Sequence, residues 1–172
     1  FIDSNHGWVF PSSSVHIYHT DDGGENWFLQ TPAQNTWFRD VYFLNQDIGW
    51  LVGYDFNLGK GIISKTINGG QNWTSTSTAN YGIYDPKKIH FIDANNGWIT
   101  GYDFSKNEFT LFFTNNGGQD WSEIFAKNQE FYYSEASSYF KDVNHIWLNT
   151  GEEIYCVNTD KYLNINVAEK IK

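Results

Sequence analysis

The chain has 172 residues, 40% of them apolar and 19% aromatic, which is enough to fill one hydrophobic core. Its net charge is −9, from 20 acids against 11 bases, and Arg39 is the single arginine. Nucleic acids and anionic membrane surfaces attract basic patches, so this charge argues against both as partners and leaves cationic or neutral ones open. No apolar stretch is long enough to span a membrane. Cys156 is the only cysteine, so no disulfide forms within the chain, and we expect a small core residue.

The first predicted unit, residues 1–37, starts with the strand end Phe1-Ile2-Asp3 and continues into Gly7-Trp8. It then reaches residues 20–27, with the sequence Thr-Asp-Asp-Gly-Gly-Glu-Asn-Trp. Glycine allows the positive φ of a tight turn, aspartate accepts hydrogen bonds from turn amides, and tryptophan can cover the hairpin. These residues therefore predict a hairpin between two strands.

The second unit, residues 38–84, repeats this order and shows four short segments of strand character, at 39–44, 49–53, 61–65 and 72–77. The third unit, residues 85–133, repeats it again. Both carry an insertion after the Gly-Trp strand that reads Gly-Tyr-Asp-Phe, at 53–56 and 101–104. The tryptophans of the Gly-Trp positions, Trp8, Trp50, Trp98 and Trp147, follow one another at 42, 48 and 49 residues.

The fourth unit, residues 134–172, departs from the pattern. Ile146-Trp147 replaces Gly-Trp, and Thr159 falls where Thr20 does. Lys161 and Leu163 then occupy the aspartate and glycine places, and the second tryptophan is absent. We expect either a degenerate blade or a closing one.

Four strands repeated every 42 to 49 residues predict an all-β propeller with four-stranded antiparallel blades, about four of them present. The turn sequence resembles the Asp-box, or BNR repeat, in which Ser/Thr, Asp, Gly and Trp recur at fixed places. The residues at these places are Thr20, Asp22, Gly24, Trp27, Thr66, Asn68, Gly70, Trp73, Thr114, Asn116, Gly118 and Trp121, and Asn68 and Asn116 replace the aspartate of the motif. In that family the motif stabilises the hairpin between the third and fourth strands and lies away from catalysis. The resemblance therefore implies a structural role, with no metal and no cofactor.

The whole pattern is most similar to the branch that holds the photosystem II assembly and stability factors and many secreted or surface bacterial proteins. It implies an exported chain acting outside the cytoplasm. Asp-box propellers also include sialidases and xyloglucanases, so the fold alone does not select a function.

The sequence argues against catalysis. Sialidases grip the substrate carboxylate with three arginines, and this chain has one. The tyrosine–carboxylate pair that serves as the nucleophile in sialidases has a similar sequence here, in Tyr132, Tyr133 and Glu135. The three arginines that accompany it in sialidases are missing. A glycosidase would need two opposed carboxylates, from among Asp55, Asp85, Asp103 and Glu130, but none lies in a catalytic motif. The histidines, His6, His16, His19, His90 and His145, lack metal-ligand spacing.

Because antiparallel strands alternate in direction, the Gly-Tyr-Asp-Phe loops share one side of the propeller with the links between blades. We expect that aromatic and acidic side to bind a protein partner. The alternative is that its rings pack over blade edges and cap the core. The candidate contact residues are Trp37, Tyr54, Asp55, Phe56, Tyr84, Asp85, Tyr102, Asp103, Phe104, Tyr132 and Tyr133.

The expected function is a non-catalytic scaffold or accessory subunit of an envelope or secretion complex. The alternative is a carbohydrate-binding or glycoside-hydrolase propeller, so a glycan partner stays open. Because four blades leave strand edges uncovered and the chain opens inside a repeat, we expect completion by missing chain, a partner or a second copy.

Overall fold

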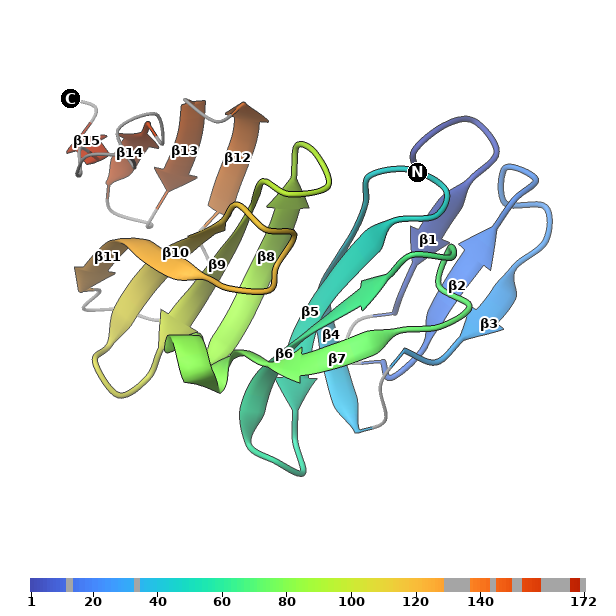
Figure 1. The fold of residues 1–172 in the computed structure, drawn as a ribbon, viewed down its shortest axis with the longest axis horizontal. Helices are drawn as coiled ribbons and strands as arrows, with labels where there is room; N and C mark the ends of the chain where they lie inside the picture. The colour runs from blue at the N-terminus through green and yellow to red at the C-terminus, as the bar shows by residue number, and fades with distance from the viewer. Residues whose placement is uncertain are drawn as a thin grey trace.

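The computed structural model describes residues 1–11, 14–32, 35–128, 137–142, 145–149, 153–158 and 168–170. These residues form four antiparallel β-sheets that follow one another in chain order (Figure 1). A short 3-10 helix, η1 (Thr78–Tyr81), lies between the second and third sheets. The predicted all-β propeller fold is confirmed by the sheets and by similarity to solved propeller structures described below.

The strands of each sheet are neighbours in sequence order. The first sheet holds β1 (Gly7–Val9), β2 (Ile17–Thr20) and β3 (Phe28–Gln30). The second holds β4 (Thr36–Phe43), β5 (Gly49–Asp55), β6 (Lys60–Thr66) and β7 (Thr74–Ser77). The third holds β8 (Asp85–Phe91), β9 (Gly97–Asp103), β10 (Glu108–Thr114) and β11 (Ser122–Asn128). The fourth holds β12 (Ser137–Asp142), β13 (His145–Asn149), β14 (Ile154–Val157) and β15 (Ala168–Lys170). The blade boundaries expected at 37/38, 84/85 and 133/134 stay a prediction, and the last lies outside the described residues.

The first sheet has three strands in the described chain, and Phe1-Ile2 lies beside the start of β1. Ile2 donates its amide to the carbonyl of His6 at 3.0 Å. Leu44 and Ile92 make the same bond to Ile48 and Asn96, after strands β4 and β8. Phe1-Ile2 therefore occupies the place where β4 and β8 end.

The hydrophobic core lies in three layers, one between each pair of successive sheets. The middle layer shows the principle: Trp50 and Val52 project from β5 toward Phe91 and Ile99 of the third sheet. Leu51, between them, projects to the other side and joins the layer beneath the first sheet. Since strand side chains alternate between faces, a central strand buried on both sides reads as an unbroken apolar run.

The glycine before each repeated tryptophan has a steric reason. A Cβ at Gly49 would lie 2.6 Å from the ring of Phe43, and one at Gly97 would lie 2.5 Å from the ring of Phe91. The phenylalanine ring at the end of the first strand thus lies over the glycine of the second strand. In the fourth sheet Ile146 takes the place of the glycine opposite Phe140, so a side chain is present where the other sheets have none.

Candidate functional site: the link face and the turns that support it

The second and third blades present two kinds of turn, on opposite sides. One side, the turn face, carries the turns at 44–48 and 92–96 and three Gly-Gly turns, at 20–27, 66–73 and 114–121 (Figure 1). The other side, the link face, carries the loops 56–59 and 104–107 and the links between blades. Gly69 and Gly117 donate amides to Asp47 and Asn95 at 2.9 and 2.8 Å, which joins the two turns of the turn face within a blade.

The three Gly-Gly turns have the same internal hydrogen bonds. In the second, the buried Thr66 hydroxyl donates to Asn68 Oδ1 at 3.0 Å and accepts from the Gly70 amide at 2.9 Å. Asn68 Oδ1 also accepts from the amide of Asn72 at 2.9 Å. The first turn repeats these bonds with Asp22 and the third with Asn116. Both glycines of each turn have positive φ.

All twelve residues of the repeated turn pattern therefore lie in or at the end of hairpin turns. The closing tryptophan donates Nε1 to its own turn in two copies, from Trp73 to Gly70 at 3.0 Å and from Trp121 to Gly118 at 3.2 Å. The Asp22 carboxylate accepts hydrogen bonds from the backbone amide and side chain of Asn26 and from the Thr20 hydroxyl. The bond from the Asn26 amide is the main reason that the pKa of Asp22 falls to about 2. Within the described residues, no three His, Cys, Asp or Glu side chains are grouped to hold a metal.

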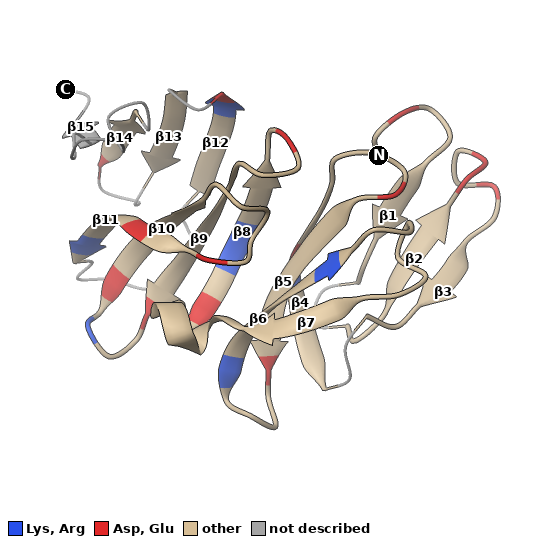
Figure 2. Cartoon of the chain, in the orientation of Figure 1, with Lys and Arg blue, Asp and Glu red and all other residues tan. Residues whose placement is uncertain are grey.

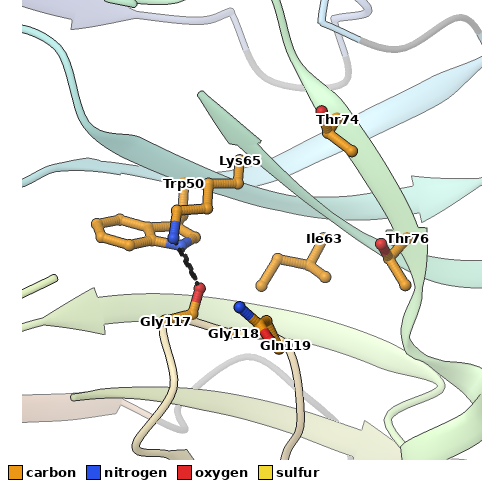
Figure 3. Close-up of a pocket in the computed structure, with 8 residues that line it drawn as sticks. All are labelled: Trp50, Ile63, Lys65, Thr74, Thr76, Gly117, Gly118 and Gln119. Atoms are coloured by element: carbon orange, nitrogen blue, oxygen red, sulfur yellow. Dashed lines mark hydrogen bonds between the residues drawn. The ribbon is translucent and has the colours of Figure 1, made fainter. Parts of the chain in front are cut away.

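The Gly-Gly turns also connect neighbouring blades through a carbonyl. The Nε1 of Trp50 and the Nζ of Lys65 each donate to Gly117 O at 3.2 Å, and both point toward it in Figure 3. Gln30 Nε2 makes the corresponding bond to Gly69 O at 2.9 Å between the first two sheets. Sequence reasoning missed this role of Lys65 and Gln30, because their partners lie 52 and 39 residues away.

A cavity of about 210 Å³ lies beside this contact, lined by Trp50, Ile63 and Lys65 of one blade and Gly118 of the next (Figure 3). Lys65 is the one titratable group in its lining, and burial lowers the pKa of its ammonium group. The amine is engaged with Gly117 O and lies 5.1 Å from the centre of the Trp50 ring. The lysine thus forms part of the contact between the two blades.

The link face carries a pair of exposed aromatic rings. Trp37 of β4 and Phe56, which follows β5, lie 5.2 Å apart between ring centres, and both are about two-fifths exposed, at 42% and 41%. Tyr54 lies directly across the strand pair from Trp37 and is half-buried. Leu58, in the same loop, is also exposed, and the sequence reasoning missed it. Three of the candidate contact residues are thus brought together at one corner of the second blade.

The third blade presents a different version of the same loop. Phe104 is exposed, whereas Tyr102 beneath it is buried and donates its hydroxyl to Asn107 Oδ1. Tyr84, in the link before β8, is exposed. Tyr132 and Tyr133 lie outside the described residues. The candidate face therefore offers Phe104 and Tyr84 to a partner here, with Tyr102 packed below.

The candidate acids of the link face hold the fold together. Asp55 accepts from the amides of Asn57 and Leu58 at 2.9 and 3.0 Å, and Asp103 caps its own loop through Ser105. Asp103 is buried. Its burial raises the carboxyl pKa, but the hydrogen bonds from Ser105 and the Lys106 amide, together with the Lys106 charge, outweigh burial and leave the pKa lowered. Lys106 lies 3.5 Å from the same carboxylate.

Asp85 is likewise buried and lies between two cations. Arg39 Nε is 3.4 Å from Asp85 Oδ1, and Lys87 Nζ pairs with Oδ2. The single arginine of the chain thus belongs to a structural ion pair across two blades, so Asp85 and Asp103 support the link face from beneath.

Acids concentrate on the turn face instead. The turns of the first three blades there contain Asp3, Asp21, Asp22, Glu25, Asp47, Asp93 and Asp120, and no lysine or arginine lies in these turns (Figure 2). The link-face acids Asp85 and Asp103 have cationic neighbours. The turns of the turn face carry acids without lysine or arginine, a charge balance that disfavours anionic partners.

In the part of the chain that the structure describes, no helix is long and apolar enough to cross a membrane. Comparison with family models finds no match, and none of the curated proteins matches. Two solved structures are similar. A structure of YCF48 bound to D1 peptide is 19% identical, with a TM-score of 0.57 over 99% of this chain and 66% of that chain. YCF48 from Cyanidioschyzon merolae is 17% identical, with a TM-score of 0.69 over 98% of this chain and 53% of that chain.

The chain thus spans about two thirds of one YCF48 chain and about half of the other. At these identities the similarity establishes the fold. The chain folds as part of a β-propeller, as the repeats and the sequence resemblance imply.

Proposed function

We propose that the chain is a non-catalytic scaffold that binds an apolar segment of a protein partner on its link face, as an accessory subunit of an extracytoplasmic complex. The observation that carries the proposal is the exposed pair Trp37 and Phe56, together with exposed Leu58 in the same loop as Phe56. Large aromatic side chains lose little conformational freedom on binding and dominate the energetics of protein interfaces.

Two further facts support a binding role. Asp85 and Asp103, two of the acids from which a glycosidase would need its pair, are buried and lie beside cations. One structural neighbour, YCF48, is described in complex with a D1 peptide. A peptide-binding role for this chain extends that similarity and is part of the proposal, as is export, which rests on the sequence resemblance.

The test measures binding of the purified chain to an array of short peptides that differ in apolar and charged content. We expect apolar or cationic peptides to bind. Changing Trp37, Phe56 and Leu58 together to alanine should weaken the best of them about tenfold or more, as is usual for central aromatic contacts. The matched control is Ile67→Ala, which removes an exposed apolar side chain from the turn face and should leave affinity unchanged.

The glycan alternative is tested with the same variants. If the chain binds glycans on an array and loses them with the Trp37, Phe56 and Leu58 changes, the exposed rings form a carbohydrate platform instead. Peptide affinity that is equal in the triple variant and the wild type would contradict the assignment of the link face.

A further inference from the structure

The second and third Gly-Gly turns contain the same chemically labile pair of residues. Asn68-Gly69 and Asn116-Gly117 are each followed by Gly-Gln in the sequence. In an Asn-Gly pair the backbone nitrogen of the glycine can attack the side-chain carbonyl carbon of the asparagine, because the glycine has no side chain to hinder the approach. The local sequences of the two pairs nearly match, so contacts made in the folded chain decide which of them reacts.

The reaction is a deamidation and needs water alone as co-reactant. At Asn68, a bond forms between the Gly69 nitrogen and Cγ, and the side-chain nitrogen leaves as ammonia with the proton of the Gly69 amide. Water then opens the resulting cyclic imide. Cleavage between the ring nitrogen and Cγ gives aspartate, and cleavage between the ring nitrogen and the main-chain carbonyl carbon gives iso-aspartate.

Hydrogen bonds restrain the reacting atoms in both turns. In the second turn, Asn68 Oδ1 accepts bonds from the Thr66 hydroxyl at 3.0 Å and the Asn72 backbone amide at 2.9 Å. The Gly69 amide, which supplies the attacking nitrogen, donates to Asp47 O at 2.9 Å. The third turn has the equivalent bonds. Either turn must therefore open locally before it reacts, and the rate follows how often it opens.

The third turn has further restraints, which come from its own hairpin and from the second blade. Asn116 Nδ2, the nitrogen that must leave, donates to Asp120 Oδ2 at 3.0 Å. Gly117 is buried, and its carbonyl accepts bonds from Trp50 Nε1 and Lys65 Nζ, both at 3.2 Å. Opening of this turn therefore disrupts a contact between two blades.

The second turn is less restrained. Among the described residues, the side chain of Asn68 is bonded through its oxygen, and its nitrogen has no hydrogen-bond partner. Gly69 is half-buried, and its carbonyl accepts a bond from Gln30 Nε2 at 2.9 Å. A cavity of about 560 Å³ lies beside this turn, with Gly70 and Gln71 in its lining. This space allows the turn to open with the blades still packed.

We propose that Asn68 is a site of spontaneous deamidation in the folded protein, whereas Asn116 is protected by its additional contacts. The aspartate product fits the turn, since Asp22 Oδ1 of the first turn accepts the same bonds from the Thr20 hydroxyl and the Asn26 amide, at 2.8 and 2.9 Å. Deamidation thus converts the second turn to the form of the first and adds a negative charge to the turn face. The proposal does not depend on the proposed function, since the link face takes no part in it.

The experiment compares the two asparagines within one chain. The native protein is incubated in mildly alkaline buffer, because base removes the glycine amide proton, and a second sample is incubated in the same buffer with urea. Mass spectrometry of peptides digested in acid measures the exchange of NH2 for OH at each site, with Asn68→Asp as the chromatographic standard. In urea we expect Asn68 and Asn116 to react at similar rates. In the native protein Asn68 should react several times faster than Asn116.

Two variants at the same place of the two turns form a matched pair. Asp120→Ala removes the acceptor of the Asn116 side-chain nitrogen and should speed the reaction of Asn116 several-fold. Asn72→Ala removes a side chain but keeps the backbone amide that holds Asn68 Oδ1, so Asn68 should react at the wild-type rate. Both positions are exposed, and circular dichroism shows that each variant is folded before it is compared.

Two results in the native protein would overturn the proposal. One is Asn68 that stays unreacted during the time in which it reacts in urea, and the other is Asn116 that reacts as fast as Asn68. A rate at Asn116 that Asp120→Ala leaves unchanged would contradict protection by the Asp120 bond.

Discussion

The indole of Trp50 lies flat on the ring of Phe91, with ring centres 3.6 Å apart, while its Nε1 donates to Gly117 O at 3.2 Å. One side chain of the second blade thus contacts both the inner strand and the Gly-Gly turn of the third. The repeated tryptophan is therefore an element of blade-to-blade packing. Gly49, which precedes it, leaves room for the ring of Phe43 on the adjacent strand of its own blade.

Gly97→Ala should lower the free energy of unfolding by about 1–3 kcal/mol, the usual cost of overpacking a core. The added methyl would lie 2.5 Å from the Phe91 ring and push it away from Trp50. Urea unfolding followed by tryptophan fluorescence measures the loss. Gly101→Ala in the same strand is the control, since its nearest contact is Ile83 Cγ2 at 3.1 Å. Equal losses in the two variants would contradict the steric explanation.

Thr66→Ala should destabilise the protein by about 1–3 kcal/mol, because the Gly70 amide loses its acceptor in a buried turn. Thr66→Ser keeps the hydroxyl and should retain most of the free energy of unfolding that Thr66→Ala loses. Both are measured by chemical denaturation at neutral pH. A serine variant as unstable as the alanine variant would show that the methyl group, rather than the hydroxyl, is what the turn requires.

Asp22→Asn should flatten the dependence of stability on acid pH. The bond from the Asn26 amide and others lower the Asp22 pKa from 3.8 to about 2 in the folded chain. A carboxyl with a lowered folded pKa stabilises the fold above pH 3.8 and loses that contribution as pH falls through about 2. Asparagine keeps the acceptor, as Asn68 and Asn116 do in the other turns.

The reciprocal variant, Asn68→Asp, should make stability fall more steeply in acid. It places a carboxylate where the Asn68 side-chain oxygen now accepts a hydrogen bond from the Asn72 backbone amide. Unfolding free energies measured between pH 2 and pH 6 compare both variants with the wild type. If the free energy of unfolding of Asp22→Asn falls with pH as steeply as that of the wild type, the Asp22 carboxylate does not contribute to the pH dependence.

His90→Phe should remove a loss of stability that the wild type shows in mildly acidic solution. Burial lowers the pKa of His90 below 6.5, and its ring lies against Phe140 and near Tyr42, which is neutral in this range. The unfolded chain then binds a proton more readily, so stability declines as pH falls from 6.5 through the folded pKa. Phenylalanine keeps the stack on Phe140. Thermal unfolding between pH 5 and pH 7.5 measures the difference, and an NMR titration of the imidazole reads the pKa directly.

The Gly-Gly turns could be predicted because their chemistry is local. Thr20, Asp22 and Gly24 bond to one another across two to four residues, so the sequence pattern contains every partner. The candidate site could be predicted only in part. Trp37, Phe56 and Phe104 are exposed as expected, whereas Tyr102, Asp85 and Asp103 of the same loops and links are buried.

The sequence by itself determined the repeat, the strand order and the alternation of turns between two sides, because periodicity and turn residues act over a few positions. Only the tertiary structure decided which copy of a repeated residue is covered. Trp27 and Trp121 hold the same place in the motif, yet they are 38% and 6% exposed. Trp121 meets a phenylalanine that the preceding blade's Trp50 covers, and Trp27 meets Phe1, which no described ring covers. Burial depends on which blade lies alongside, and that contact joins residues about forty positions apart.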